Sequence, residues 1–182
     1  MTEGGQAARL PLFVLIALAG CEGEAPLVPP EIALAPEGGD GSEISLIEGA
    51  QGGFHVLFAL RARGLRAGSA LVEWSVRPAG TGDPPLLRGD VRSFLSEVDA
   101  EGWLRAPAAV PCVLCPSPAP VSEVPLEFQF AVHDRDGTMG ERTLALSPRC
   151  PDAAAAHARC EALCGRRQNS NSATTPTPLP VP

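Results

Sequence analysis

The residues best suited to chemistry in this chain are two histidines and a short acidic turn. His55 and His133 carry imidazoles, and His133 is followed by Asp134, Asp136 and Glu141. Such groups can serve general acid–base catalysis, and carboxylate oxygens are the ligands that Ca²⁺ prefers. The further spaced acids of a dedicated calcium loop are missing from the sequence. We therefore favour a solvated hairpin turn at this position over a cation site.

The two histidines are expected to lie apart. Each falls on the polar side of an alternating pattern, His55 within 54–62 and His133 within 126–133. If these two segments belong to opposite sheets, as in an immunoglobulin-like fold, the two imidazoles cannot converge. We therefore expect no catalytic residue, no metal site and no cofactor, and we expect that the protein is not an enzyme.

Composition excludes several further activities. All 14 basic residues are Arg, so no lysine is present to bind phosphate or form a Schiff base. The sequence contains neither a Gly-x-Ser-x-Gly elbow nor a His-Glu-x-x-His motif. A formal net charge of −7 argues against nucleic acid as a partner, because phosphate backbones require a clustered basic face.

One pair of cysteines has the spacing of a redox motif. Cys112 and Cys115 are separated by two residues, as in disulfide oxidoreductases. A reactive pair needs a helix N-terminus to lower its thiol pKa, and the prolines around this segment prevent a helix from starting there. We therefore interpret residues 112–115 as a loop without redox activity.

The N-terminus has the pattern of an export signal. Leu10–Ala19 is an apolar run of ten residues, which is too short for a transmembrane helix of roughly 20 residues. It ends in Leu18-Ala19-Gly20-Cys21, which resembles the lipobox of bacterial lipoproteins. The resemblance implies that residues 1–20 are removed and that the Cys21 thiol is alkylated by diacylglycerol.

The lipobox also implies a location. Acylated Cys21 would hold the chain on a lipid bilayer in the cell envelope. The next residue is Glu22, whereas well-studied relatives retained at the inner membrane have Asp there. We therefore expect an outer-membrane lipoprotein that faces the periplasm or the cell surface.

The mature chain divides into four segments. Residues 21–41 are rich in Pro, Gly and Glu and are interpreted as a flexible tether. Residues 42–149 form the folded domain, and residues 150–167 form a cysteine-bearing helix. The uncharged Pro/Thr-rich segment 168–182 is predicted to be disordered.

Period-two patterning predicts the fold of 42–149. Apolar and mostly polar residues alternate over 54–60, 72–77 and 126–133, as expected for strands with one buried face. Turn residues separate these segments, and Asp136-Gly137 is typical of a hairpin. We expect an all-β, immunoglobulin- or fibronectin-like antiparallel sandwich with one short C-terminal helix, and Trp74 in its core. No parallel sheet is expected.

The cysteines of an exported protein are expected to form disulfides rather than a zinc site. Once Cys21 is lipidated, the candidates are Cys112, Cys115, Cys150, Cys160 and Cys164. Cys150 lies ten residues before Cys160, about 15 Å along a straight helix, which we interpret as too far for a bond. We expect Cys112 and Cys115 to bond to two of the three C-terminal cysteines, with Cys160 and Cys164 favoured.

The mature domain also resembles a group of uncharacterised predicted lipoproteins of high-GC Gram-negative bacteria. The resemblance rests on Gly49-Ala50-Gln51-Gly52-Gly53-Phe54-His55 and on Asp134-Arg135-Asp136-Gly137, and it implies no activity. The favoured function is a non-catalytic binding or structural module that contacts another envelope protein or a glycan. The alternative is an envelope enzyme or metal-binding protein that uses the region of His55, His133, Asp134 and Asp136.

Overall fold

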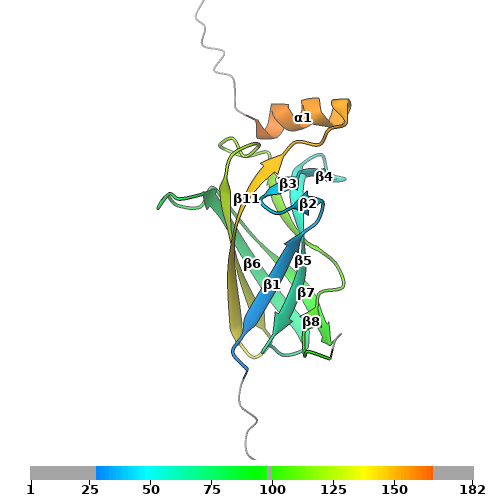
Figure 1. The fold of residues 1–182 in the computed structure, drawn as a ribbon, viewed down its shortest axis with the longest axis vertical. Helices are drawn as coiled ribbons and strands as arrows, with labels where there is room; N and C mark the ends of the chain where they lie inside the picture. The colour runs from blue at the N-terminus through cyan, green and yellow to red at the C-terminus, as the bar shows by residue number, and fades with distance from the viewer. Residues whose placement is uncertain (1–27, 98–99, 166–182) are drawn as a thin grey trace, which may run out of the picture.

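The computed structural model describes residues 28–97 and 100–165. This part of the chain is mostly β, with one short helix (Figure 1). The strands are β1 (Glu31–Pro36), β2 (Gly39–Asp40), β3 (Glu43–Ser45), β4 (Ile47–Glu48), β5 (Phe54–Arg63), β6 (Gly68–Pro78), β7 (Leu87–Glu97), β8 (Leu104–Arg105), β9 (Val110–Cys115), β10 (Leu126–Asp134) and β11 (Met139–Arg149). The helix is α1 (Ala154–Cys164). The all-β prediction with one C-terminal helix is confirmed.

The strands follow one hydrogen-bonded path that curls back on itself. Its order is β1-β5-β8-β7-β6-β10-β11-β3-β2, and β4 and β9 also pair with β5. The pairs are antiparallel except for β11 with β3, which run parallel over three residues. The expectation of a purely antiparallel arrangement is therefore wrong at this one short pair.

The curl brings β5 face to face with β10. The ring of Phe58 lies 5.5 Å from that of Phe128 and 4.9 Å from that of Phe130, edge to face in both cases. At the far side, a Cβ built on Gly140 would lie 3.2 Å from Cγ2 of Ile32, so β11 passes close to β1. The shape is therefore close to a barrel around a single apolar core.

The core consists of the side chains that the alternating pattern predicted to face inward. Every second residue is buried along β5 and along β10, and Phe128 and Trp74 are buried. These inward residues are the apolar half of each period-two pattern, so burying them satisfies the sequence pattern. Phe94 departs from this picture, because its side chain is 58% exposed on β7.

Two predicted loop segments are strands instead. The second half of the 21–41 tether forms β1, which pairs with β5 along its whole length, and the short β2. The segment 112–115, interpreted as a loop, belongs to β9 on the other edge of β5. In both cases β5 offers a free edge whose N–H and C=O groups need partners, and this need outweighs the weak strand propensity of proline-containing segments.

Helix α1 lies across one end of the barrel, beyond β3 and β4 (Figure 1). It was predicted within 150–167, and the structure confirms it with narrower bounds. Ala153 occupies its N-cap position and makes no side-chain capping bond. Cys160 and Cys164 are the buried residues of this helix. Arg159 adds a two-pronged hydrogen-bonded ion pair with Glu48 of β4.

Candidate functional site

The structure places His55 apart from the other three residues that sequence reasoning had considered for catalysis. His55 lies on β5, next to the turn at Gly49, where an added Cβ would meet its Nδ1 at 3.0 Å. His133 lies on β10, and its Nε2 is 3.0 Å from Oε2 of Glu73 on β6. The two histidines point outward from strands whose inner faces pack together, so they lie on opposite sides of the barrel.

Asp134 points inward and holds the hairpin together. One carboxylate oxygen accepts the backbone N–H groups of Asp136 and Thr138, and the other accepts that of Arg66, each at 2.9 Å. Desolvation by burial raises the pKa of Asp134, but these backbone hydrogen bonds outweigh it and the net pKa is lowered. The hairpin prediction is confirmed, whereas the solvated environment predicted for it is wrong at Asp134, which is 6% exposed.

Asp136 is the outward acid of the same turn. Its Oδ2 lies 2.8 Å from Nε of Arg66, in an exposed ion pair that joins the β10–β11 hairpin to the β5–β6 turn. Within residues 28–97 and 100–165, no three His, Cys, Asp or Glu side chains gather in a group that could hold a metal ion.

Two disulfides hold α1 on the barrel. Cys115 of β9 is bonded to Cys164, and Cys150 is bonded to Cys160. The Cys115–Cys164 bond fits the expected docking of the helix near residues 112–115. The exclusion of a Cys150–Cys160 bond is wrong: Cys150 precedes the helix and the chain turns back there, so that the two Cα atoms are 5.6 Å apart. A distance measured along the helix axis does not apply to such a turn.

Cys112 is not in a disulfide, contrary to expectation. Its side chain is fully buried in the core, on the same face of β9 as Leu114. The pairing of β9 with β5 shifts register next to Phe54, which turns Cys115 toward α1 and leaves Cys112 facing the interior. Burial raises the pKa of the Cys112 thiol far above its ordinary value.

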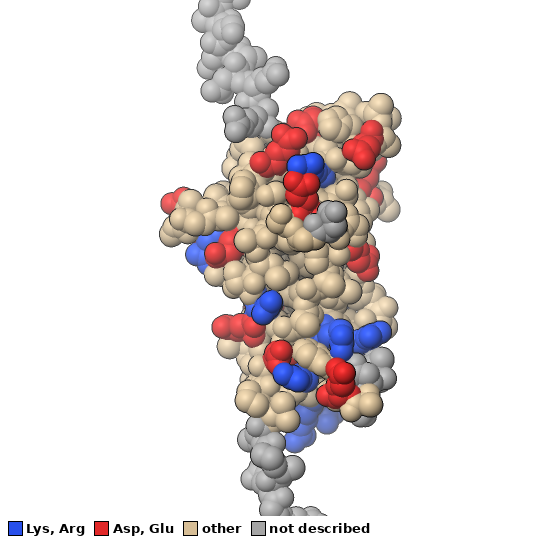
Figure 2. Space-filling view, in the orientation of Figure 1, with Lys and Arg blue, Asp and Glu red and all other residues tan. Residues whose placement is uncertain are grey.

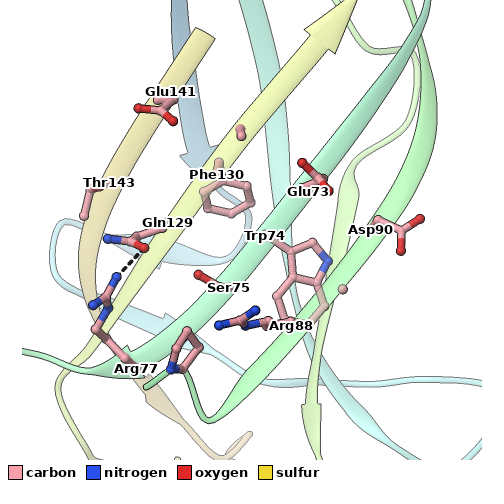
Figure 3. A pocket seen from close by; sticks show the side chains of 13 residues that line it. Glu73, Trp74, Ser75, Arg77, Arg88, Asp90, Gln129, Phe130, Glu141 and Thr143 are labelled. Atoms are coloured by element: carbon pink, nitrogen blue, oxygen red, sulfur yellow. Dashed lines mark hydrogen bonds between the residues drawn. The ribbon is translucent and has the colours of Figure 1, made fainter. Parts of the chain in front are cut away.

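An open groove lies elsewhere, over the sheet formed by β7, β6, β10 and β11. This groove encloses about 660 Å³. Figure 3 shows its polar side chains on neighbouring strands, with Glu73, Ser75 and Arg77 at alternate positions along β6. Its lining comprises Glu73, Trp74, Ser75, Arg77, Pro85, Arg88, Gly89, Asp90, Gln129, Phe130, Ala131, Glu141 and Thr143.

Strand register places the charged residues of this groove in rows that run across the strands. Asp90 and Glu73 are direct neighbours on β7 and β6, and Glu141 lies in the same row on β11, next to Ala131 of β10. The following row carries Arg88 opposite Ser75. Acidic and basic side chains therefore line the same groove in adjacent rows.

Further contacts fix two side chains at the groove. Arg77 donates a hydrogen bond to Gln129, and its Nε lies 3.2 Å from Oε1 of Glu127. Glu73 is held by His133. The groove can thus offer both hydrogen-bond donors and acceptors to a polar ligand, and its open form suits a macromolecular surface.

Sequence reasoning missed this groove. The alternation did indicate that Glu73, Ser75 and Gln129 face outward, but not that β6 lies between β7 and β10. The neighbours of a strand depend on the whole topology, and no local pattern reports them.

Comparison with known proteins adds little to this picture. No family model matches the chain, and no curated protein matches it. Among solved structures, the chain is similar to the sporulation control protein Spo0M from Bacillus subtilis, with 12% identity and a TM-score of 0.32. The match covers 67% of this chain and 50% of that chain, so the chain spans about half the length of that protein. A likeness this low carries no argument about function.

The expected signal peptide, the lipidation site Cys21 and the tail 168–182 lie outside the described residues. Among the described residues, α1 is the one helix, and it is neither long nor apolar enough to cross a membrane.

Proposed function

We propose that this chain is a lipid-anchored envelope lipoprotein whose β domain acts as a non-catalytic binding or structural module. The groove over β7, β6, β10 and β11 carries the proposal, since side chains from four strands line an open surface with charges of both signs. Such a surface suits another envelope protein or a glycan, both of which present many hydrogen-bonding groups.

The anchor is supported by the sequence Leu18-Ala19-Gly20-Cys21 after an apolar run. Two disulfides in a small domain fit an exported protein, because oxidising compartments preserve such bonds. Glu22 after the modified cysteine favours the outer membrane.

We further infer that the curled sheet is an immunoglobulin- or fibronectin-like sandwich. Support comes from the facing of β5 and β10 across the core and from the position of Trp74 within it. The residues of β1, β5 and β9 would form one layer, and those of β7, β6, β10 and β11 the other.

Replacing Cys21 with Ser tests the anchor. Without its thiol the chain cannot accept diacylglycerol, so we expect lipid labelling to disappear and the protein to leave the membrane fraction. Membrane fractionation equal to that of the wild type would contradict the anchor.

Cross-linking from intact envelopes tests the module. We expect a partner captured by the wild type to be lost in an Arg88→Gln, Glu141→Gln variant. A matched variant, Arg149→Gln with Glu43→Gln, removes an exposed ion pair outside the groove and should retain that partner. Equal capture by both variants would show that the groove is not the binding surface.

A second candidate, an envelope enzyme or metal-binding protein, is favoured by one observation. His133 is hydrogen-bonded to Glu73, which lines the groove, and a carboxylate beside an imidazole is the usual way to orient a general base. Calorimetric titration with Zn²⁺ and Ca²⁺ separates the two candidates. The module predicts no difference in heat between the wild type and His133→Ala, whereas saturable binding lost in the variant supports the second candidate.

A further inference from the structure

Strand β7 has a long edge with no strand paired to it. One side of β7 pairs with β6 over residues 87–95. On the other side Ser96 and Glu97 pair with β8, and the next strand there, β9, pairs with β5 instead. Within the part of the chain that the structure describes, the N–H and C=O groups of 87–95 that point away from β6 therefore have no strand partner. Such an edge is a template for a further strand.

The other edges of the sheet are less suited to accept a strand. Proteins protect edges by keeping them short or by placing proline in them, because proline cannot donate a hydrogen bond. β1 contains Pro36, β9 contains Pro111 and β2 has only two residues. β7 has 11 residues and no proline. Of these four strands, β7 is therefore the best template.

The inward side chains of β7 are incompletely covered. The inward residues of β6, from Ala70 to Val76, are buried, whereas Leu87 and Val91 of β7 are only half-buried against the same core. On the outer face, Phe94 is 58% exposed. A strand added beside β7 would remove apolar surface of these side chains from water, which stabilises the pairing.

The outward charges of β7 alternate in sign. They are Arg88, Asp90 and Arg92, and none of them has an ion pair or a side-chain hydrogen bond with another described residue. Asp90 lies opposite Glu73 on β6, and like charges in facing positions repel each other. Charges protect an edge against most strands, but a strand with the opposite sign at each facing position is attracted.

A second copy of β7 is such a strand, in one register. Because outward side chains must face outward ones, the twofold axis of an antiparallel pair passes through a residue. An axis at Asp90 or Arg92 would set that residue against its own copy, with like charges in contact. An axis at Gly89 would set Arg92 against Leu86 and bring Pro85 into the ladder. An axis beyond Arg92 would require residues that already pair with β8.

An axis at Val91 gives complementary pairs at the outward positions. Asp90 then faces Arg92 of the second copy, and by symmetry Arg92 faces Asp90 of that copy, so two ion pairs form. Arg88 faces Phe94 of the second copy, and a guanidinium is attracted to the face of an aromatic ring. The unpaired charges and the exposed ring of β7 thus obtain partners together.

The same axis uses the whole free edge. Val91 is the central residue of the segment 87–95, so each residue of this segment gains a partner. On the inner face, Val91 meets its own copy and Leu87 meets Leu95 of the second copy. An antiparallel ladder of this length adds about eight to ten backbone hydrogen bonds. This is as many as a typical protein–protein interface has.

We propose that this chain forms a twofold-symmetric dimer by antiparallel pairing of β7 with β7 of a second copy, centred on Val91. Pairing joins β7, β6, β10 and β11 of both copies into one continuous sheet, with both grooves open on the same face of it. Acidic and basic side chains are interspersed along the barrel on the face that Figure 2 shows, so no large surface of one charge sign opposes a second copy there. The dimer does not depend on lipidation of Cys21.

Charge reversal tests the dimer and its register. Sedimentation equilibrium of the full chain in density-matched detergent should give twice the mass of one chain. Asp90→Arg and Arg92→Asp each create two like-charged pairs across the axis, so each should raise the dissociation constant of the dimer at least about tenfold. The double variant Asp90→Arg, Arg92→Asp exchanges the two signs and should restore the dimer. Both positions are exposed, and Asp90→Arg removes the repulsion with Glu73, so the domain should still fold.

Glu141→Arg is the matched control. It reverses an exposed carboxylate of the same groove on β11, away from the paired edge, and should leave the dissociation constant unchanged. A monomeric wild type, or single variants that dimerise as well as the wild type, would overturn the proposal. A double variant that stays monomeric would overturn the register at Val91.

Paired cysteines test the register independently. When chains with Asp90→Cys and chains with Arg92→Cys are produced together and oxidised, the facing cysteines should form a disulfide between chains. Either chain alone should give little covalent dimer, because position 90 lies about 8 Å from position 90 of the second copy, too far for a disulfide. Equal yields from one kind of chain alone, or no bond in the mixture, would contradict the proposed pairing.

Discussion

Cys115 at the end of β9 is joined to Cys164 at the last residue of α1, with their Cα atoms 5.5 Å apart. This bond spans 49 residues, whereas the Cys150–Cys160 bond spans ten. The backbone carbonyl of Cys164 also accepts hydrogen bonds from the N–H groups of Val121 and Ser122. The last turn of α1 is thus fixed both covalently and by hydrogen bonds to the loop before β10.

Removal of the longer bond should cost more stability. In the chain-entropy model, closing 49 residues contributes about 4 kcal/mol and closing ten contributes about 3 kcal/mol. We expect Cys115→Ala, Cys164→Ala to lower the free energy of unfolding more than Cys150→Ala, Cys160→Ala does. Urea unfolding of the oxidised proteins measures the difference. The reverse order would show that α1 is held mainly from its other end.

The Cys112 thiol should be unreactive in the folded protein. Burial raises its pKa, so almost no thiolate forms at neutral pH, and the reagent also has no access. We expect a maleimide to label the oxidised mature chain at Cys112 only after denaturation, as peptide mapping under non-reducing conditions would show. Rapid labelling of native protein at Cys112 would contradict its position in the core.

Asp134 should make the stability of the domain dependent on acid pH. Its folded pKa is lowered from an ordinary value of 3.8, so its stabilising contribution is present above that value and is lost as pH falls through the folded pKa. Asp134→Asn places an amide N–H₂ where one backbone N–H now donates, and should cost about 2 kcal/mol at neutral pH.

The same variant supplies the pH test. Urea unfolding of the wild type and of Asp134→Asn should differ clearly at about pH 7, and the difference should shrink as the pH falls below 3.8 and the carboxyl becomes protonated. Asp136→Asn is the matched control, because the exposed ion pair of Asp136 with Arg66 contributes at most about 1 kcal/mol. If the two free energies of unfolding still differ by the same amount in acid, the negative charge of Asp134 does not stabilise the domain.

The strands that could be predicted from the sequence are those in which apolar and polar residues alternate. In β10 every second side chain is buried and the alternate positions are mostly polar. The predictions of this strand and of its inward face were therefore both correct. In β1 and β9 the prolines and small residues gave no alternation. Their structure results from pairing with the two edges of β5, a contact distant in sequence that local propensity does not report.

The candidate site was less predictable than the fold, for a related reason. The outward positions of Glu73 and Gln129 followed from alternation, but the groove exists because β6 and β10 are neighbours in the sheet. The hydrogen bond between His133 and Glu73 joins residues 60 positions apart. Side chains brought together only by topology cannot be grouped from their spacing along the chain.

Gly89 should be intolerant of any side chain because of Trp74. The two residues are paired on β7 and β6, and a Cβ built on Gly89 would lie 2.4 Å from Cζ2 of the indole. The indole is buried, so moving it would disturb the residues packed against it. We expect Gly89→Ala to lower the free energy of unfolding by about 1–3 kcal/mol, and Trp74→Ala to lower it by about 3–5 kcal/mol.

Gly82→Ala is the control for the backbone effect of replacing a glycine. A Cβ built on Gly82 meets no atom within 4 Å, so this substitution should change the free energy of unfolding by less than about 0.5 kcal/mol. The double variant Gly89→Ala, Trp74→Ala then isolates the clash. Since the methyl group would fill part of the space left by the indole, we expect the double variant to be more stable than the sum of the two single losses predicts. Additive losses would mean that the strain at Gly89 arises from contacts other than Trp74.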